Sequence, residues 1–190
     1  MTWKTIVPNE VWTKENFLPE HVEGAIVSSP LVFDATVGSL WVPLFAGKYA
    51  ELLAEGIFAL ERLGDCLAED EESYLFKITP SHLDAVVSQG YLEEGGNGRH
   101  VLVVAGEAMP SARLQVWQGQ YLPQSQFINE YGPTETTVGC TTYAIDKTRL
   151  SDYGAAASIP IGGPLGETSL YVLNSAMAVQ SIGSVGELYV

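Results

Sequence analysis

The segment from Asn129 to Glu135 carries the densest set of chemically useful groups in the chain. It follows an apolar run, and Gly132-Pro133 forces a turn within it. The Tyr131 ring could stack on a base, Thr134 and the turn amides could hold a phosphate, and Glu135 could hold Mg²⁺. We therefore predict a nucleotide site. The alternative is a polar surface turn after a buried strand.

Two alternating patterns surround this segment. Short apolar runs recur at intervals of about 25 residues, near the size of a strand plus a crossover helix. Strands are predicted at 25–27, 49–53, 74–76, 101–104 and 126–128. Helical periodicity lies between them, at 37–45 with a kink expected at Pro43, at 57–67, from Thr79-Pro80 to Gly90, and from Pro110 to Trp117. The fold class predicted is α/β, with a mainly parallel sheet flanked by helices.

The pattern changes after about residue 150. The Gly- and Pro-rich stretch 159–164 interrupts regular structure, and strands predicted at 168–173 and 186–190 suggest a partial antiparallel β unit. We expect three regions: a lead-in at 1–24, an α/β binding subdomain at 25–150, and a linker with the first strands of a β-barrel at 151–190. The sequence stops within an apolar strand, so a truncated chain is expected.

Several polar residues follow the predicted strands closely, and ligands of open parallel sheets bind beyond the carboxyl ends of the strands. The residues are Asp34, Lys77, Glu107, Glu130 and Glu135. All strands of a parallel sheet run in the same direction, so their carboxyl ends lie at one edge. We therefore expect these residues to converge on that edge.

Composition narrows the class of protein. The formal net charge is -14, which argues against nucleic acid or an anionic membrane surface as partner. Cys66 and Cys140 are far apart and predict reduced thiols, while the three histidines form no metal-ligand pattern. The sequence shows neither an apolar run of about 20 residues nor a signal peptide, so a cytoplasmic protein is expected.

The motif Asn129-Glu130-Tyr131-Gly132-Pro133-Thr134-Glu135 resembles the core motif of the adenylation domains of nonribosomal peptide synthetases, in the wider family of adenylate-forming enzymes. Supporting segments are Phe33-Asp34-Ala35-Thr36, similar to the motif that binds a substrate α-amino group, and Ala105-Gly106-Glu107-Ala108, similar to the loop flanking adenine. The segments at 159–164, 171–173 and 186–189 resemble the entry to the family's β-barrel. The resemblance implies a flavodoxin-like substrate-binding subdomain plus the start of that barrel.

The resemblance also implies ATP and Mg²⁺ as cofactors and assigns a nucleotide half-site. Tyr131 would stack on adenine, Thr134 would hold the α-phosphate, and Glu135 would bind the metal, so Thr134 and Glu135 are the catalytic candidates. The nucleotide-binding set carried over is Gly106, Glu107, Ala108, Asn129, Tyr131, Gly132 and Thr134.

The same resemblance carries over nine amino-acid-binding positions: Asp34, Ala35, Gly38, Lys77, Val103, Ala105, Glu130, Val138 and Gly139. Asp34 would bind the α-ammonium group. Lys77 only donates hydrogen bonds and ionised Glu130 only accepts them, so a primary amide suits the pair, and asparagine is the predicted substrate. Aspartate would face Glu130 as a like charge, and glutamine would be discriminated by about 1–3 kcal/mol. The alternative is that Lys77 and Glu130 pair with each other above an empty or apolar pocket.

The reaction that the resemblance implies joins an amino acid to ATP, giving aminoacyl-AMP, which is then transferred to a carrier-protein thiol. The family's phosphate-binding Lys loop and C-terminal catalytic Lys are not found in this sequence, so we expect the chain alone to be inactive or slow. Implied partners are the rest of the adenylation domain, a carrier-protein domain and a small MbtH-like protein. The alternatives are a binding or scaffold module without catalysis, a flavodoxin-type flavin or receiver domain, and a related acyl-CoA ligase.

Overall fold

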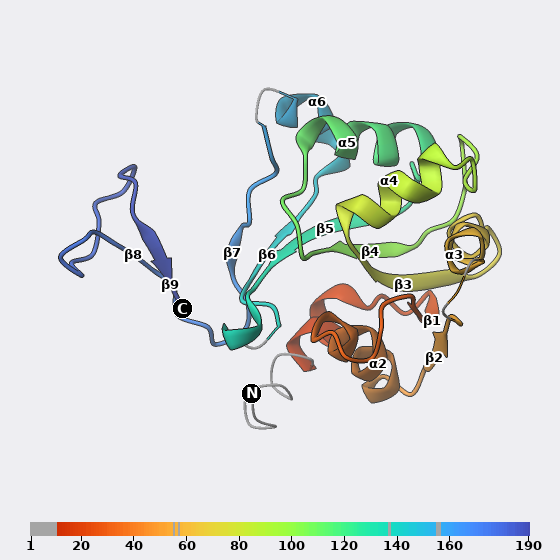
Figure 1. The fold of residues 1–190 in the computed structure, drawn as a ribbon, viewed down its shortest axis with the longest axis horizontal. Helices are drawn as coiled ribbons and strands as arrows, with labels where there is room; N and C mark the ends of the chain where they lie inside the picture. The colour runs from red at the N-terminus through yellow and green to blue at the C-terminus, as the bar shows by residue number, and fades with distance from the viewer. Residues whose placement is uncertain (1–10, 55, 57, 137, 155–156) are drawn as a thin grey trace.

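A seven-stranded sheet forms the centre of the computed structural model, which describes residues 11–190 except 55, 57, 137 and 155–156 (Figure 1). The sheet has the order β2-β1-β3-β4-β5-β6-β7. Its strands are β1 (Val22–Val27), β2 (Tyr49–Leu52), β3 (Ser73–Ile78), β4 (Val101–Val104), β5 (Gln126–Tyr131), β6 (Thr141–Ala144) and β7 (Gly163–Pro164). The first five are parallel, in the flavodoxin-like order 2-1-3-4-5. The predicted α/β class is confirmed.

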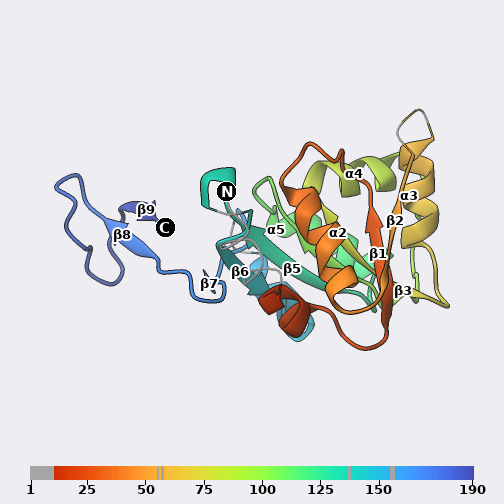
Figure 2. The same cartoon turned by 90° about the horizontal axis from the view of Figure 1, so that it is seen from below.

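Helices cover both faces of this sheet (Figure 2). They are α2 (Ala35–Phe45), α3 (Ala59–Leu67), α4 (Pro80–Ser88), α5 (Ser111–Val116), continued by a π-helical turn to Tyr121, and α6 (Leu150–Tyr153). Helices α3, α4 and α5 pack on one face of the sheet, while α2 and the helical residues 11–17 pack on the other. Alternation along each strand creates this division: Phe76 faces the first layer, and Leu75 faces the second.

Helix α4 is flanked by the residues that the sequence predicted to start and end it. The Thr79 side chain accepts a hydrogen bond from the His82 amide at 3.2 Å, and Pro80 occupies the first turn, where a missing N–H costs nothing. Gly90 follows the helix with φ +74°, a conformation that suits glycine. In α2, Pro43 lies in the last turn, and the helix ends two residues later.

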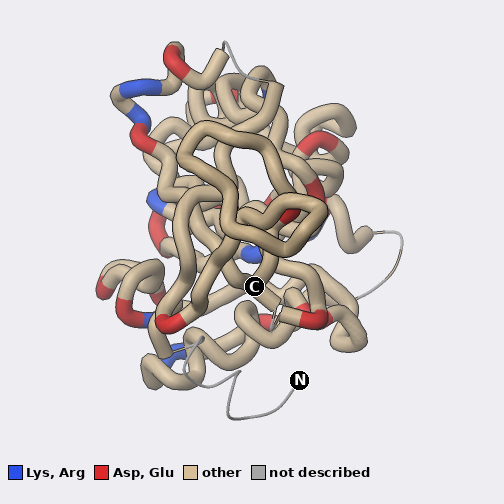
Figure 3. The backbone as a smooth tube through the Cα atoms, turned by 90° about the vertical axis from the view of Figure 1, so that its left-hand side faces the viewer, with Lys and Arg blue, Asp and Glu red and all other residues tan. Residues whose placement is uncertain are grey.

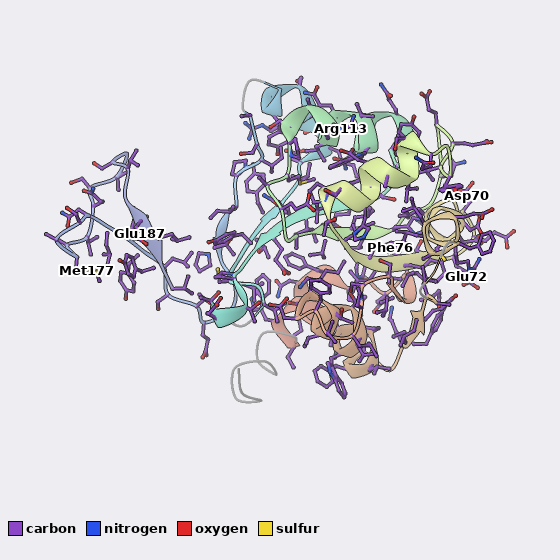
Figure 4. All side chains as sticks on the ribbon, viewed as in Figure 1. Asp70, Glu72, Phe76, Arg113, Met177 and Glu187 are labelled. Atoms are coloured by element: carbon purple, nitrogen blue, oxygen red, sulfur yellow. The ribbon has the colours of Figure 1, made fainter. Side chains whose placement is uncertain are left out.

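The antiparallel part of the fold was predicted only in part. β8 (Tyr171–Leu173) and β9 (Glu187–Tyr189) form the expected antiparallel pair. Figure 4 shows Met177 and Glu187 on this hairpin, apart from the sheet that carries Phe76. Strands β6 and β7 were not predicted from the sequence: β6 pairs antiparallel with β5, and β7 pairs antiparallel with β6. Both are short and lack an alternating apolar pattern, so pairing with the neighbouring strand decides their conformation.

Both cysteines lie in the part of the chain that the structure describes. Cys66 and Cys140 are free and buried, and burial raises the pKa of both thiols. Among the residues that the structure describes, there is no helix long and apolar enough to cross a membrane. The same residues contain no group of three His, Cys, Asp or Glu side chains that could hold a metal ion. Acidic residues are distributed over several segments rather than gathered in one place (Figure 3).

Candidate functional site

A buried ion pair lies beneath α2, on the second face of the sheet. Lys77 Nζ is 2.6 Å from Glu130 Oε1, and the two side chains are only 8% and 5% exposed. Strand register explains the meeting: Lys77 on β3 is aligned with Val103 on β4, and Glu130 lies near the end of β5. Alternation directs both side chains toward α2, since Lys77 follows Leu75 by two residues and Glu130 follows Ile128 by two.

The ion pair borders a small cavity between the sheet and α2. The cavity has a volume of about 10 Å³, the space of about one water molecule. Six of the nine predicted amino-acid-binding residues line it, namely Gly38, Lys77, Val103, Glu130, Val138 and Gly139. Thus the two charges pair directly, as the alternative interpretation stated, and they do so inside the predicted pocket.

The loop between β5 and β6 closes this cavity under strain. Val138 has φ 68°, a left-handed conformation that is a genuine outlier for a β-branched residue. At the next residue, Gly139, an added Cβ would lie 2.7 Å from the carboxyl carbon of Glu130. Backbone strain of this kind clusters at ligand sites. Glycine at 139 leaves room for the carboxylate, and the strained Val138 completes the wall.

Asp34 lies directly before the first residue of α2. Its side chain makes no capping hydrogen bond. It accepts a hydrogen bond from the Thr134 hydroxyl at 2.5 Å, across 100 residues of sequence. This contact joins the predicted α-ammonium ligand to the predicted phosphate ligand. Three of the predicted amino-acid-binding residues do not line the small cavity, namely Asp34, Ala35 and Ala105. Through its contact with Thr134, Asp34 lies instead at the loop that follows β5.

A second, larger cavity opens at the carboxyl ends of β4 and β5, with a volume of about 480 Å³. Six of the seven predicted nucleotide-binding residues line it: Gly106, Glu107, Ala108, Asn129, Tyr131 and Gly132. Tyr131 is 41% exposed, so part of its side chain is open to a ligand. Gly106 has φ +84°, which turns the backbone at the end of β4. Thr134 and Glu135 do not line this cavity, although the adjacent Pro133 does.

Two polar residues of this cavity already have protein partners. The Asn129 amide group donates to the carbonyl oxygens of Ile159 and Pro160, at 3.3 and 2.9 Å. Glu107 Oε2 accepts from the Ser81 hydroxyl at 2.6 Å. Asn129 therefore fixes the Ile159–Pro160 segment that forms one wall, and Glu107 ties the cavity to the start of α4.

Sequence reasoning missed several residues of the small cavity: Thr13, Ser39, Val42 and Leu75. Leu75 could have been found from strand alternation, since it precedes Lys77 by two residues. Ser39 and Val42 follow Gly38 by one and four residues. The four-residue spacing places Val42 on the same side of α2 as Gly38. Thr13 comes from the lead-in region, where the sequence carried no signal.

Comparison with known proteins decides the family. The family model described as AMP-binding enzyme matches residues 7–190. The chain belongs to the AMP-binding enzyme family. Among curated relatives, bacitracin synthase 3 of Bacillus licheniformis is 32% identical over 171 residues, and tyrocidine synthase 3 of Brevibacillus parabrevis is 30% identical over 186. The matches cover 90% and 97% of this chain but 2% and 3% of those synthetases, so the chain spans a small part of their length.

Solved structures agree on the fold. The Vibrio cholerae adenylation domain AlmE, solved with glycyl-adenosine-5'-phosphate, matches with a TM-score of 0.76 and 20% identity, over 98% of this chain and 32% of that one. The N-terminal subdomain of Klebsiella oxytoca NpsA matches with a TM-score of 0.73 and 17% identity, over 95% and 46%. Together with the synthetase relatives, these matches confirm the resemblance to an adenylation domain of nonribosomal peptide synthetases.

Proposed function

We propose that this chain is the amino-acid- and nucleotide-binding part of an adenylation domain that converts an amino acid and ATP into aminoacyl-AMP. One observation carries the proposal: Glu130 lines both the small cavity and the large one. A substrate side chain held in the first cavity would therefore lie beside a nucleotide held in the second. Adjacent sites of this kind suit a reaction between two bound molecules.

The volume and the lining groups of the large cavity support a nucleotide as its ligand. It offers an exposed aromatic ring, backbone groups at the Gly106 turn and a volume within the usual range for small-molecule sites. Mg²⁺ is commonly held by one or two carboxylates together with substrate phosphates, so Glu135 alone is a sufficient protein ligand. The bound metal would neutralise charge on the phosphates. Thr134 would contact the α-phosphate after its hydroxyl leaves Asp34.

The small cavity supports a side chain with a primary amide, and asparagine is our proposed substrate. The amide would insert between Lys77 and Glu130, with its carbonyl accepting from the ammonium and its NH₂ donating to the carboxylate. The cavity is smaller than a carboxamide, so the two charges must separate as the substrate enters. Asp34 would then bind the substrate α-ammonium at the mouth.

A substrate panel tests this function in the intact protein. Amino-acid-dependent exchange of pyrophosphate into ATP should be fastest with asparagine. Glutamine should follow, weaker by about 1–3 kcal/mol in kcat/KM, because it carries one more methylene. Aspartate should be poor, since its carboxylate would face Glu130. Preference for a large apolar amino acid would overturn the assignment of the pocket.

The proposed acceptor of the activated amino acid is a carrier-protein thiol. The synthetase relatives support this, as does the fold match to PA1221, described as a protein containing adenylation and PCP domains. A small MbtH-like protein is a further proposed partner. Copurification of either protein with the intact synthetase, and loading of the carrier thiol with asparagine, would test these partners.

A further inference from the structure

One polar group of the small cavity has no partner. The Ser39 hydroxyl lies on α2 in a residue that is 1% exposed, and it makes no hydrogen bond. Ser39 nevertheless lines the same cavity as Lys77 and Glu130. Burying a hydroxyl without a hydrogen bond costs about 1–3 kcal/mol in folded proteins. A group that enters the cavity could remove that cost by bonding to the hydroxyl.

From this geometry we infer that Ser39 is a specificity-determining residue, whose hydroxyl binds the polar end of the substrate side chain. The inference rests on the proposed function, because it assigns Ser39 to the same amino-acid pocket. Ser39 was not among the nine positions carried over from the family resemblance. It adds a hydroxyl from α2 to the donor Lys77 and the acceptor Glu130.

A primary amide has enough hydrogen-bonding capacity for all three groups. Its carbonyl oxygen has two lone pairs and its nitrogen carries two hydrogens, so Lys77 and Glu130 use only half of them. A hydroxyl both donates and accepts, and Ser39 can bond to either end of the amide. An apolar side chain would leave the hydroxyl, the ammonium and the carboxylate without a substrate partner. The three groups together therefore favour polar over apolar substrates.

The test is Ser39→Ala in the intact protein, with Ser111→Ala as a matched control. Ser111 is also a buried serine whose hydroxyl has no partner, but it lies on α5 and does not line the small cavity. Ser39→Ala should raise the KM of the preferred polar amino acid about three- to tenfold, the value of one hydrogen bond. Its kcat and the KM for alanine should stay close to wild type, and the melting temperature without substrate should not fall, because an unpaired buried hydroxyl is removed. Ser111→Ala should leave the kinetic constants unchanged, and its melting temperature should not fall either.

Two results would overturn the inference. One is an unchanged KM for the preferred amino acid in Ser39→Ala. The other is a loss of thermal stability that accompanies an equal loss of activity toward every substrate, which would show a structural role. The proposed substrate is judged separately, on the wild-type panel. If that panel favours a polar amino acid other than asparagine, the substrate proposal fails, and the Ser39 effect is then measured on the amino acid that leads.

Discussion

The two cavities that Glu130 lines are formed by different parts of the structure. The small one is enclosed by side chains from strand interiors, from α2 and from the β5–β6 loop, among them the buried charges of Lys77 and Glu130. The large one is formed mainly by strand-end turns, with one exposed aromatic ring. Side chains can be exchanged without altering the sheet, whereas turns depend on the backbone. On the proposed function, substrate choice would rest on the first cavity and nucleotide binding on the second.

The largest effect is expected from breaking the buried pair. Glu130→Leu would leave Lys77 buried without an opposite charge, so the free energy of unfolding should fall by about 3–5 kcal/mol. The double variant Lys77→Met with Glu130→Leu should recover most of this loss, because the desolvation of both charges is then avoided. Chemical denaturation of the three proteins measures both effects.

The exposed pair Arg149–Asp152 provides the control, since its side chains are 62% and 54% exposed. Asp152→Ala should change stability by less than about 1 kcal/mol. If the double variant were as unstable as Glu130→Leu, the ion pair would be needed for the stability of the fold rather than for substrate binding.

Asp34→Ala should have the next largest effect, and on activity rather than stability. Loss of the carboxylate removes the proposed partner of the substrate α-ammonium, so kcat/KM for the amino acid should fall at least about 30-fold. The melting temperature should change little, because the Asp34 side chain does not cap α2. Normal activation of amino acids by this variant would remove Asp34 from the site.

Tyr131→Ala should affect the nucleotide alone. Stacking of a base on an aromatic ring contributes about 1–3 kcal/mol, so the KM for ATP should rise by about 5- to 150-fold. The KM for the amino acid should stay near the wild-type value, and Tyr131→Phe should retain most of the affinity for ATP. Equal changes in both KM values would show that the two cavities do not divide the substrates in this way.

The smallest effect tests the backbone of the large cavity. Gly106→Ala forces a residue with a Cβ into φ +84°, which should cost about 1–2 kcal/mol of stability. Space is not the reason, since the nearest atom to an added Cβ is a Thr79 methyl at 3.5 Å. Gly119→Ala, where the added Cβ meets open space, should be neutral or stabilising. Similar unfolding curves for the two variants would contradict the role of the Gly106 turn.

The sequence predicted the parallel core because each of the first five strands is a distinct apolar run and the intervening helices carry clear signals, such as Thr79-Pro80. The antiparallel strands β6 and β7 could not be predicted in the same way, because their residues become strands through pairing, β6 with β5 and β7 with β6. Likewise, the left-handed conformation of Val138 runs against its intrinsic preference. The contact between Asp34 and Thr134 depends on tertiary structure alone.

The clearest failure of sequence reasoning concerns residues without a chemical signature. Ser39 is an ordinary helix residue in the sequence, and only the packing of α2 against the sheet makes its hydroxyl a buried, unpaired group. Lys77 and Glu130 were found because they closely follow predicted strands and occupy positions that the family resemblance assigns to the amino-acid pocket. Their direct contact was one of two arrangements that the sequence allowed.

The central claim is that Lys77 and Glu130 select an amide, and Glu130→Gln tests it most directly. Glutamine at this position removes the like charge that opposes aspartate and supplies a donor for its carboxylate, while Lys77 keeps an anionic partner in the substrate. We expect the ratio of kcat/KM for asparagine to that for aspartate to fall at least tenfold in the intact protein, mainly through a gain with aspartate. A ratio that stays at the wild-type value, in a variant that remains folded and active, would contradict the claim.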